Sequence, residues 1–186
     1  TFSTTSGYTF DVCGFLTGST IWTNGSSGNY FLKTLNDSGL DATADYALAE
    51  GFNTTASGYA SHAEGFNTLA SGTVSHAEGF QTQATDDNAH AKGQNTIASG
   101  RWSHAEGYET TASGGTSHTE GRQTFTIGNE SHAEGYQTTA IGNQSHAEGD
   151  NTIAIGVASH AEGYLTQATG TTSHAEGVNT LAGGIG

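Results

Sequence analysis

Proline and methionine are absent from this chain of 186 residues, cysteine occurs once, and lysine and arginine together occur four times. A single cysteine excludes a disulfide bond within the chain, so we interpret Cys13 as a buried small residue, with an interchain bond as the alternative. Four basic against 18 acidic residues give a net charge of −14, which argues against a nucleic-acid partner. No apolar run approaches the roughly 18 residues of a membrane helix, so we expect no membrane insertion.

What the chain has is a repeat. Ten consecutive units of 14 residues fill residues 47–186 without insertion or deletion, and their best preserved core is Ser-His-Ala-Glu-Gly-x-x-Thr-x-Ala-Ser-Gly-x-x. A unit this short cannot bury a hydrophobic face alone, so its copies must stack as successive turns of a solenoid. The sequence therefore predicts a rod and not a globular enzyme.

Some positions of the unit vary and others do not. We number them 1 to 14 as in residues 61–74; glycine fills position 5 and threonine position 8 in all ten units, while nine units have histidine at position 2 and nine have glutamate at position 4. Position 9 changes freely, for example through Leu69, Gln83 and Phe125, as a solvent-facing position allows. The uniform positions are therefore under physical constraint.

Two short strands per unit follow from the alternation of side chains along a strand. Positions 1, 3 and 5 then share one face, as do positions 8, 10 and 12, and both faces carry only small residues. Two such faces can close into a thin roll, with the glycines at the tight bends. Histidine and glutamate are too large for that interior and must lie outside. We expect an all-β fold, a narrow parallel β-roll or β-solenoid of ten turns.

This thin interior points to oligomerisation. Alanine, serine and threonine bury little apolar area to offset the entropy of ordering the chain. The uniform His/Glu face is the surface that a partner would cover, and a symmetric trimer would bring three such ladders together, with imidazole donating hydrogen bonds to carboxylate. The predicted subunit interface consists of His62, Glu64, His76, Glu78, His90, His104, Glu106, His118, Glu120, His132, Glu134, His146, Glu148, His160, Glu162, His174 and Glu176.

The pattern Ser-His-Ala-Glu-Gly-x-x-Thr-x-Ala-x-Gly resembles the 14-residue repeat of the YadA-like head domain of trimeric autotransporter adhesins, usually Ser-Val-Ala-Ile-Gly-x-x-Ala-x-Ala-x-Gly. It is closer still to a Ser-His-Ala-Glu-Gly variant that resembles segments of phage tail fibres and spikes. The resemblance covers residues 47–186 and implies a left-handed parallel β-roll that trimerises and serves as a surface rod or attachment module. Because histidine and glutamate replace the family's valine and isoleucine, a polar network would replace a dry trimer centre.

Residues 1–46 are predicted to form a separate N-terminal β module. Short aromatic and β-branched runs at residues 9–16, 20–23 and 29–35 indicate a small β-meander or hairpin. It would act as a cap, a neck or a connector to the repeat domain, which we place at residues 47–186.

A functional interpretation of the His/Glu ladder is the alternative to a structural one. Three subunits would form rings of imidazoles in which a transition metal could sit. The helical His-Glu-x-x-His motif of metalloproteases, the Pro-Cys-x-x-Cys motif of zinc deaminases and the calcium-binding nonapeptide repeat are all absent. We therefore predict a non-enzyme with no catalytic residues, metal or cofactor.

One region departs from the repeat. Asp86 replaces the glycine of position 12 and Asp87 follows it, Lys92 replaces the ladder glutamate of the next unit, and Arg101 and Trp102 end that unit. The favoured interpretation is that Lys92 relieves repulsion between neighbouring glutamates. The alternative is a recognition patch, because arginine and tryptophan are common binding anchors.

Aromatic residues recur at position 6, where ring stacking on glycans is one interpretation and packing between turns is the favoured one. They are Phe52, Phe66, Phe80, Tyr108, Tyr136 and Tyr164.

The sequence thus predicts a non-catalytic structural and attachment segment of a trimeric surface fibre or spike, either a phage tail fibre or a cell-surface adhesin rod. It would be extracellular, on a cell surface or virion, with a cell-surface receptor or glycan as a further partner. The alternatives are a self-assembling extracellular filament subunit and a monomeric ice-binding solenoid. The latter is disfavoured because the threonine ladder is assigned to the interior.

Overall fold

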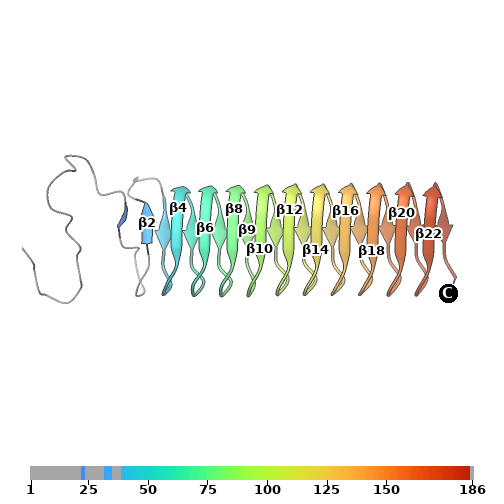
Figure 1. The fold of residues 1–186 in the computed structure, drawn as a ribbon, viewed down its shortest axis with the longest axis horizontal. Coiled ribbons are helices and arrows are strands. Elements are labelled where there is room, and N and C mark those ends of the chain that lie inside the picture. The colour runs from blue at the N-terminus through green and yellow to red at the C-terminus, as the bar shows by residue number, and fades with distance from the viewer. Residues whose placement is uncertain (1–21, 24–31, 35–38, 185–186) are drawn as a thin grey trace, which may run out of the picture.

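The computed structural model describes residues 22–23, 32–34 and 39–184, and these form a straight rod of stacked strands (Figure 1). Each unit contributes one long and one short strand, and no helix occurs among the described residues. The long strands are β4 (Leu48–Phe52), β6 (His62–Phe66), β8 (His76–Phe80), β10 (His90–Gln94), β12 (His104–Tyr108), β14 (His118–Arg122), β16 (His132–Tyr136), β18 (His146–Asp150), β20 (His160–Tyr164) and β22 (His174–Val178).

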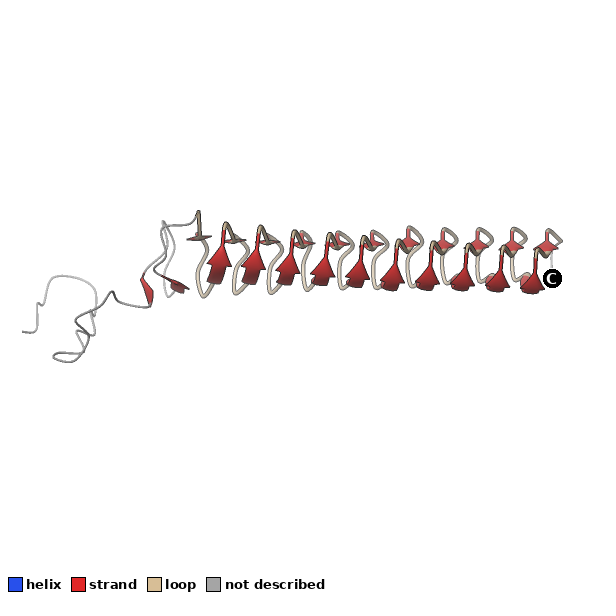
Figure 2. Cartoon of the chain, turned by 90° about the horizontal axis from the view of Figure 1, so that it is seen from above, coloured by secondary structure: helices blue, strands red, loops and turns tan. Residues whose placement is uncertain are grey.

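Short strands of two residues alternate with the long ones and form the second layer of the rod (Figure 2). They are β3 (Asp41–Ala42), β5 (Thr55–Ala56), β7 (Leu69–Ala70), β9 (Gln83–Ala84), β11 (Ile97–Ala98), β13 (Thr111–Ala112), β15 (Phe125–Thr126), β17 (Thr139–Ala140), β19 (Ile153–Ala154), β21 (Gln167–Ala168) and β23 (Leu181–Ala182).

Within each layer the strands of successive units pair in parallel and in register. In β6 and β8, for example, His62 pairs with His76 and Ala63 with Ala77. The same residue type therefore recurs at the same place in turn after turn. The prediction of an all-β parallel β-solenoid of about ten turns is confirmed.

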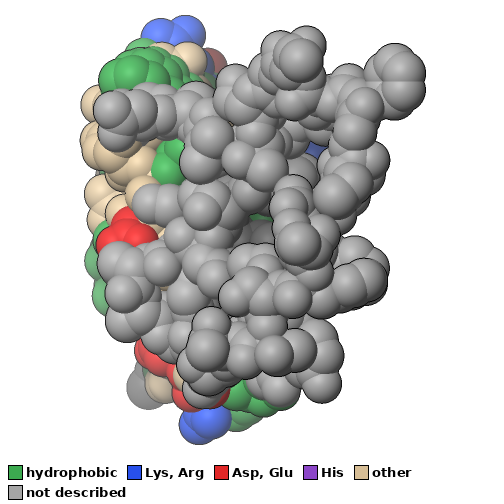
Figure 3. Space-filling view, turned by 90° about the vertical axis from the view of Figure 1, so that its left-hand side faces the viewer, with side chains coloured by type: hydrophobic (Ala, Val, Ile, Leu, Met, Phe, Trp, Pro, Cys, Tyr) green, Lys and Arg blue, Asp and Glu red, His purple; other side chains and the backbone are tan. Residues whose placement is uncertain are grey.

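The interior is built from the small residues of positions 1, 3, 8 and 10. The alanines of positions 3 and 10 are buried, as are the serines of position 1 and nearly all the threonines of position 8. The serine hydroxyl of position 1 binds the backbone in six units; in the unit beginning at Ser75, its Oγ donates to the Gly72 carbonyl oxygen at 2.7 Å. Because nothing larger fits inside the repeat units, their charged and large apolar side chains lie on the outside of the rod. The view of the N-terminal end shows acidic and basic side chains at its margin (Figure 3).

The glycine of position 5 does not face the interior, so that prediction is wrong. Gly65 is exposed and has φ +110°, which breaks the alternation of side chains after Glu64. A Cβ atom added to Gly65 would lie 2.1 Å from the carbonyl oxygen of Gly79 in the next turn. Glycine is required here because of the backbone conformation and the close approach of the next turn.

Glycine makes the sharp bends together with other residues, so the assignment of the bends to glycine is corrected only in part. The glycine of position 12 opens one bend: the Ser61 N–H donates to the Gly58 carbonyl at 3.1 Å, and a Cβ atom added to Gly58 would lie 1.9 Å from the Gly72 carbonyl oxygen. Positions 7 and 14 adopt left-handed φ values of 52–61° throughout the described units, and none of these residues is glycine. Asparagine, which tolerates this conformation, occupies position 7 in half of the units. Each bend is tied to the preceding turn: the Asn67 N–H donates to the Phe52 carbonyl at 2.9 Å.

The N-terminal end of the described structure joins the same two sheets. β1 (Trp22–Thr23) pairs antiparallel with β2 (Leu32–Thr34), and β2 pairs in parallel with β4. β3 pairs with β5, so the short-strand ladder begins N-terminal to residue 47, where we placed the start of the repeat domain. Cys13 and the predicted strand at residues 9–16 lie outside the described residues.

In the described part of the chain, no helix has the length and hydropathy that a membrane span requires.

Candidate functional site

The outer face of the long-strand sheet carries the two ladders that the sequence predicts. Positions 2 and 4 alternate with the buried positions 1 and 3, so their side chains point outward, and the parallel register stacks each on its equivalent in the next turn. The nine histidines are stacked, with neighbouring ring centroids 4.6–4.9 Å apart and neighbouring planes within 13° of each other. Each inner imidazole therefore has both of its faces covered by neighbouring imidazoles.

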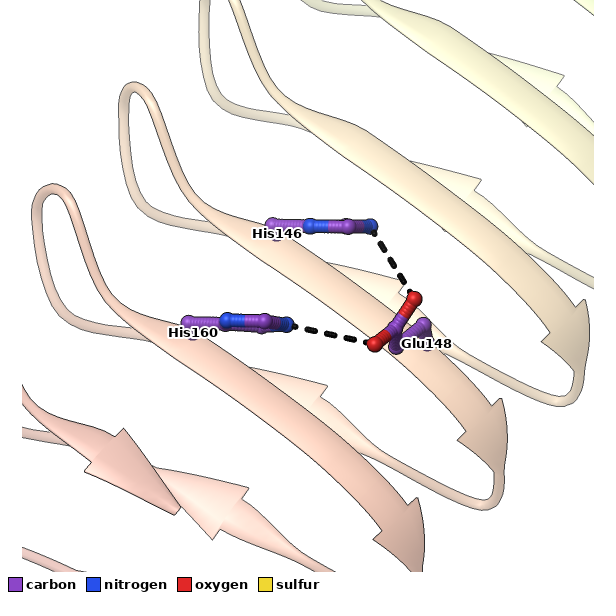
Figure 4. Close-up of side chains that lie close together, drawn as sticks. All are labelled: His146, Glu148 and His160. Atoms are coloured by element: carbon purple, nitrogen blue, oxygen red, sulfur yellow. Dashed lines mark ion pairs between the residues drawn. The ribbon is translucent and has the colours of Figure 1, made fainter. Parts of the chain in front are cut away.

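The glutamates face the edges of these rings. Glu148 lies beside two of them, with Oε2 3.9 Å from His146 Nε2 and Oε1 3.6 Å from His160 Nε2 (Figure 4). Both distances exceed that of a hydrogen bond. Eight Nε2 atoms, those of every ladder histidine except His174, are buried and have no hydrogen-bond partner among the described residues.

A groove runs along the rod beside the glutamates, because position 5 has no side chain. It is lined only by residues of positions 4 and 5, and its two parts have volumes of about 1080 Å³ and 580 Å³. The parts meet at Lys92, whose Nζ lies 2.8 Å from Glu78 Oε1. The side chain of Lys92 thus joins the ladder that it interrupts, in agreement with the favoured interpretation of charge relief.

The surroundings shift the pKa values of the ladder. Burial lowers the pKa of His76, His90, His104, His132 and His146 below the usual 6.5, and in each case a neighbouring imidazole lowers it further. These histidines are therefore neutral at neutral pH.

The carboxylates are shifted in both directions. Hydrogen bonding to Glu50, burial and the Glu78 carboxylate raise the pKa of Glu64 to about 7. The Lys92 ammonium lowers the pKa of Glu78. Glu64 is therefore partly protonated at neutral pH, whereas the Lys92 ammonium keeps Glu78 ionised.

The predicted recognition patch is only partly brought together. Arg101 pairs with Asp87 at 3.4 Å, and its guanidinium lies 4.4 Å from the centroid of the Trp102 ring. Asp86 accepts a hydrogen bond from the Asp87 N–H at 2.7 Å. Lys92 is bound to the ladder instead, so the patch consists of residues 86–87 and 101–102.

Three of the six aromatic residues of position 6 stack on one another between turns. Phe52, Phe66 and Phe80 are stacked with centroids 4.9 and 5.1 Å apart and planes within 7°. Their faces cover one another, which leaves ring edges for solvent and little platform for a sugar. Arg122, which the sequence analysis passed over, has its guanidinium 5.6 Å from the ring of Tyr108 and 5.4 Å from that of Tyr136. The 14-residue period could have predicted this contact.

A second apolar feature was also missed. On the outer side of the short-strand layer, Phe125, Ile127, Ile141 and Ile155 are exposed in three successive units. The signal in the sequence was isoleucine at position 11, where the earlier units have serine or threonine.

Comparison with known protein families identifies the repeat. The family model for the YadA head domain repeat (2 copies) matches residues 49–75, 91–117, 127–145, 133–159 and 147–164. No curated protein matches the chain. The matched segments are successive turns of the parallel solenoid described above, so the resemblance seen in the sequence is confirmed. The rod thus carries YadA head domain repeats over these segments, and its parallel solenoid is similar to a YadA-like head β-roll.

Proposed function

We propose that the chain is a non-catalytic segment of a trimeric surface fibre or spike, with the His/Glu face as the seam between its three copies. The supporting observation is the unbroken register of the ladders. A seam along a threefold axis needs one continuous face that stays on the same side of a straight rod, and the constant 14-residue period provides such a face over all ten units.

The family supports the same function. YadA head domains are structural parts of adhesins and not enzymes, and they typically form trimers at the cell surface. In this proposal the roll is left-handed, and the rod projects from a cell surface or virion as an adhesin rod or tail fibre. Residues 1–46 act as its cap, neck or connector. The apolar patch around Ile141 and the Arg101–Trp102 pair remain exposed to a receptor or glycan.

The seam is tested by native mass, measured by light scattering coupled to gel filtration. We expect three times the 19.0 kDa of one chain. Replacing Glu106, Glu120 and Glu134 with alanine should dissociate the trimer, because these side chains would lie at its axis.

The matched control replaces Glu109 and Glu130, which lie outside the ladder at positions 7 and 14, with alanine. This variant should keep the mass of the parent. An unchanged mass in the ladder variant would overturn the seam. Particles that grow with concentration beyond three chains would favour the filament alternative.

A further inference from the structure

The stacking of the histidines restricts what their Nε2 atoms can bind. Each ring lies parallel to its neighbours, so the only open direction is along the ring edge, in the plane of the ring. The lone pair of an imidazole nitrogen also lies in that plane. A ligand of Nε2 must therefore sit at the edge of the ring, where the carboxylates are.

Two carboxylates converge on this position from consecutive units. His160 Nε2 lies 3.6 Å from Glu148 Oε1 and 3.8 Å from Glu162 Oε2. At the other end of the rod, His62 Nε2 lies 3.8 Å from a Glu50 oxygen and 3.9 Å from a Glu64 oxygen. The ladder thus offers sets of one imidazole nitrogen and two carboxylate oxygens, beside sets of two histidines and one glutamate such as His146–Glu148–His160.

These distances fit ligands around a metal ion better than they fit hydrogen bonds. Ligand bonds of about 2.0–2.2 Å place two ligands of a tetrahedral ion roughly 3.3–3.5 Å apart, only a few tenths of an ångström less than observed. In the sets Glu50–His62–Glu64, Glu64–His76–Glu78 and Glu106–His118–Glu120, one ligand atom from each residue lies within 4.8 Å of the others. Small side-chain rotations would complete the geometry.

We propose that the His/Glu ladder binds a row of divalent first-row transition metal ions such as Zn²⁺, each held by one histidine Nε2 and the glutamates of two consecutive units. An imidazole ligand favours such ions over Mg²⁺ and Ca²⁺, which prefer oxygen. Water completes the coordination. The ions would be coordinated by buried nitrogen atoms that otherwise have no hydrogen-bond partner, and they would neutralise the charge of the stacked carboxylates.

Charge sets the number of ions. One divalent ion balances two carboxylates, and nine units carry a ladder glutamate, of which Glu78 is already paired with Lys92. The eight others would hold about four ions per chain, because uncompensated charge at partly buried sites is costly. All ligands of a site come from one chain, so this inference goes beyond the proposed function and does not depend on the trimer.

The test is calorimetric titration of the chelator-treated chain with Zn²⁺, checked by elemental analysis after dialysis. We expect about four ions per chain. The decisive variant is Lys92→Glu, which completes the ladder and releases Glu78, and should raise the number by about one ion. A gain of this kind cannot result from misfolding. An unchanged number, or fewer than one ion bound by the parent chain, would overturn the proposal.

Two further variants test the ligands. Replacing Glu106 and Glu120 with glutamine should remove about one ion, because amides leave the charge uncompensated. The control, Glu109 and Glu130 replaced with glutamine, removes the same charge outside the ladder and should bind as the parent does. Nitrogen NMR of labelled histidine should show the Zn²⁺-induced shift at Nε2; a shift confined to Nδ1 contradicts the proposal.

Light scattering of the same samples separates this inference from the proposed function. A monomer that binds Zn²⁺ would contradict the seam and retain the metal sites. A trimer that binds none would retain the seam and contradict the metal sites.

Discussion

A Cβ atom added to Gly163 would lie 2.1 Å from the carbonyl oxygen of Gly177, whereas a Cβ added to Gly177 would have no neighbour closer than 3.8 Å. The two glycines have nearly the same φ, 108° and 107°. They differ because another turn is stacked on the first and not on the second. This pair therefore separates backbone strain from the clash between turns.

Alanine at these two positions should have very different effects. Gly177→Ala introduces strain alone and should cost about 1–3 kcal/mol. Gly163→Ala adds the clash with the next turn and should lower the free energy of unfolding considerably more, since two backbones must separate. Denaturant unfolding of the two variants checks this. Equal losses would show that the turns are not stacked as closely as described.

The threonine ladder should tolerate loss of its hydroxyl groups. Thr138 is fully buried, and its Oγ1 has no hydrogen-bond partner among the described residues. Thr138→Val keeps the shape and removes an unsatisfied polar group, so we expect unchanged or increased stability, by up to about 1 kcal/mol. Thr138→Ser retains the hydroxyl and loses a buried methyl group, which should cost about 1 kcal/mol. The opposite order in denaturant midpoints would mean that the hydroxyl has a partner.

The left-handed bends offer a stabilising substitution. Val74 is exposed and has φ 56°, a conformation that strongly disfavours a β-branched residue. Val74→Asn should therefore stabilise the rod by about 1 kcal/mol. The reverse change at the equivalent bend of the next unit, Asn88→Val, should destabilise it by a similar amount, since Asn88 also has φ 56°. Thermal melting of both variants should give shifts of opposite sign; shifts of the same sign would contradict this explanation.

The repeat made most of the fold predictable. Ten units of constant length determine the parallel register, and the size of the residues separates the interior of Ala63 and Thr68 from the exterior of His62 and Glu64. The error at Gly65 arose because alternation holds only for extended backbone, and a positive φ ends it. The sequence does not reveal a φ value where glycine is compatible with either sign.

The ladder was predictable in its residues but not in its chemistry. The period places the histidines on one face, whereas the orientation of their rings and the buried Nε2 atoms follow from packing between turns. The sequence alone therefore suggested hydrogen bonds between imidazole and carboxylate, and the distances within the chain are too long for them.

The response to acid will show whether the ladder histidines are neutral in the assembled protein. Five of them have a lowered pKa, so below about pH 6.5 the unfolded chain binds more protons than the folded one. The folded state therefore loses stability as the pH decreases. The raised pKa of Glu64, about 7, opposes this, but it is one group against five. With chelator present, the melting temperature should therefore decrease as the pH is lowered from about 7.5 to 5.5. The charged groups that face these rings are the ladder carboxylates and Lys92. A melting temperature that increases as the pH is lowered would mean that the carboxylates hold the imidazoles protonated across the seam.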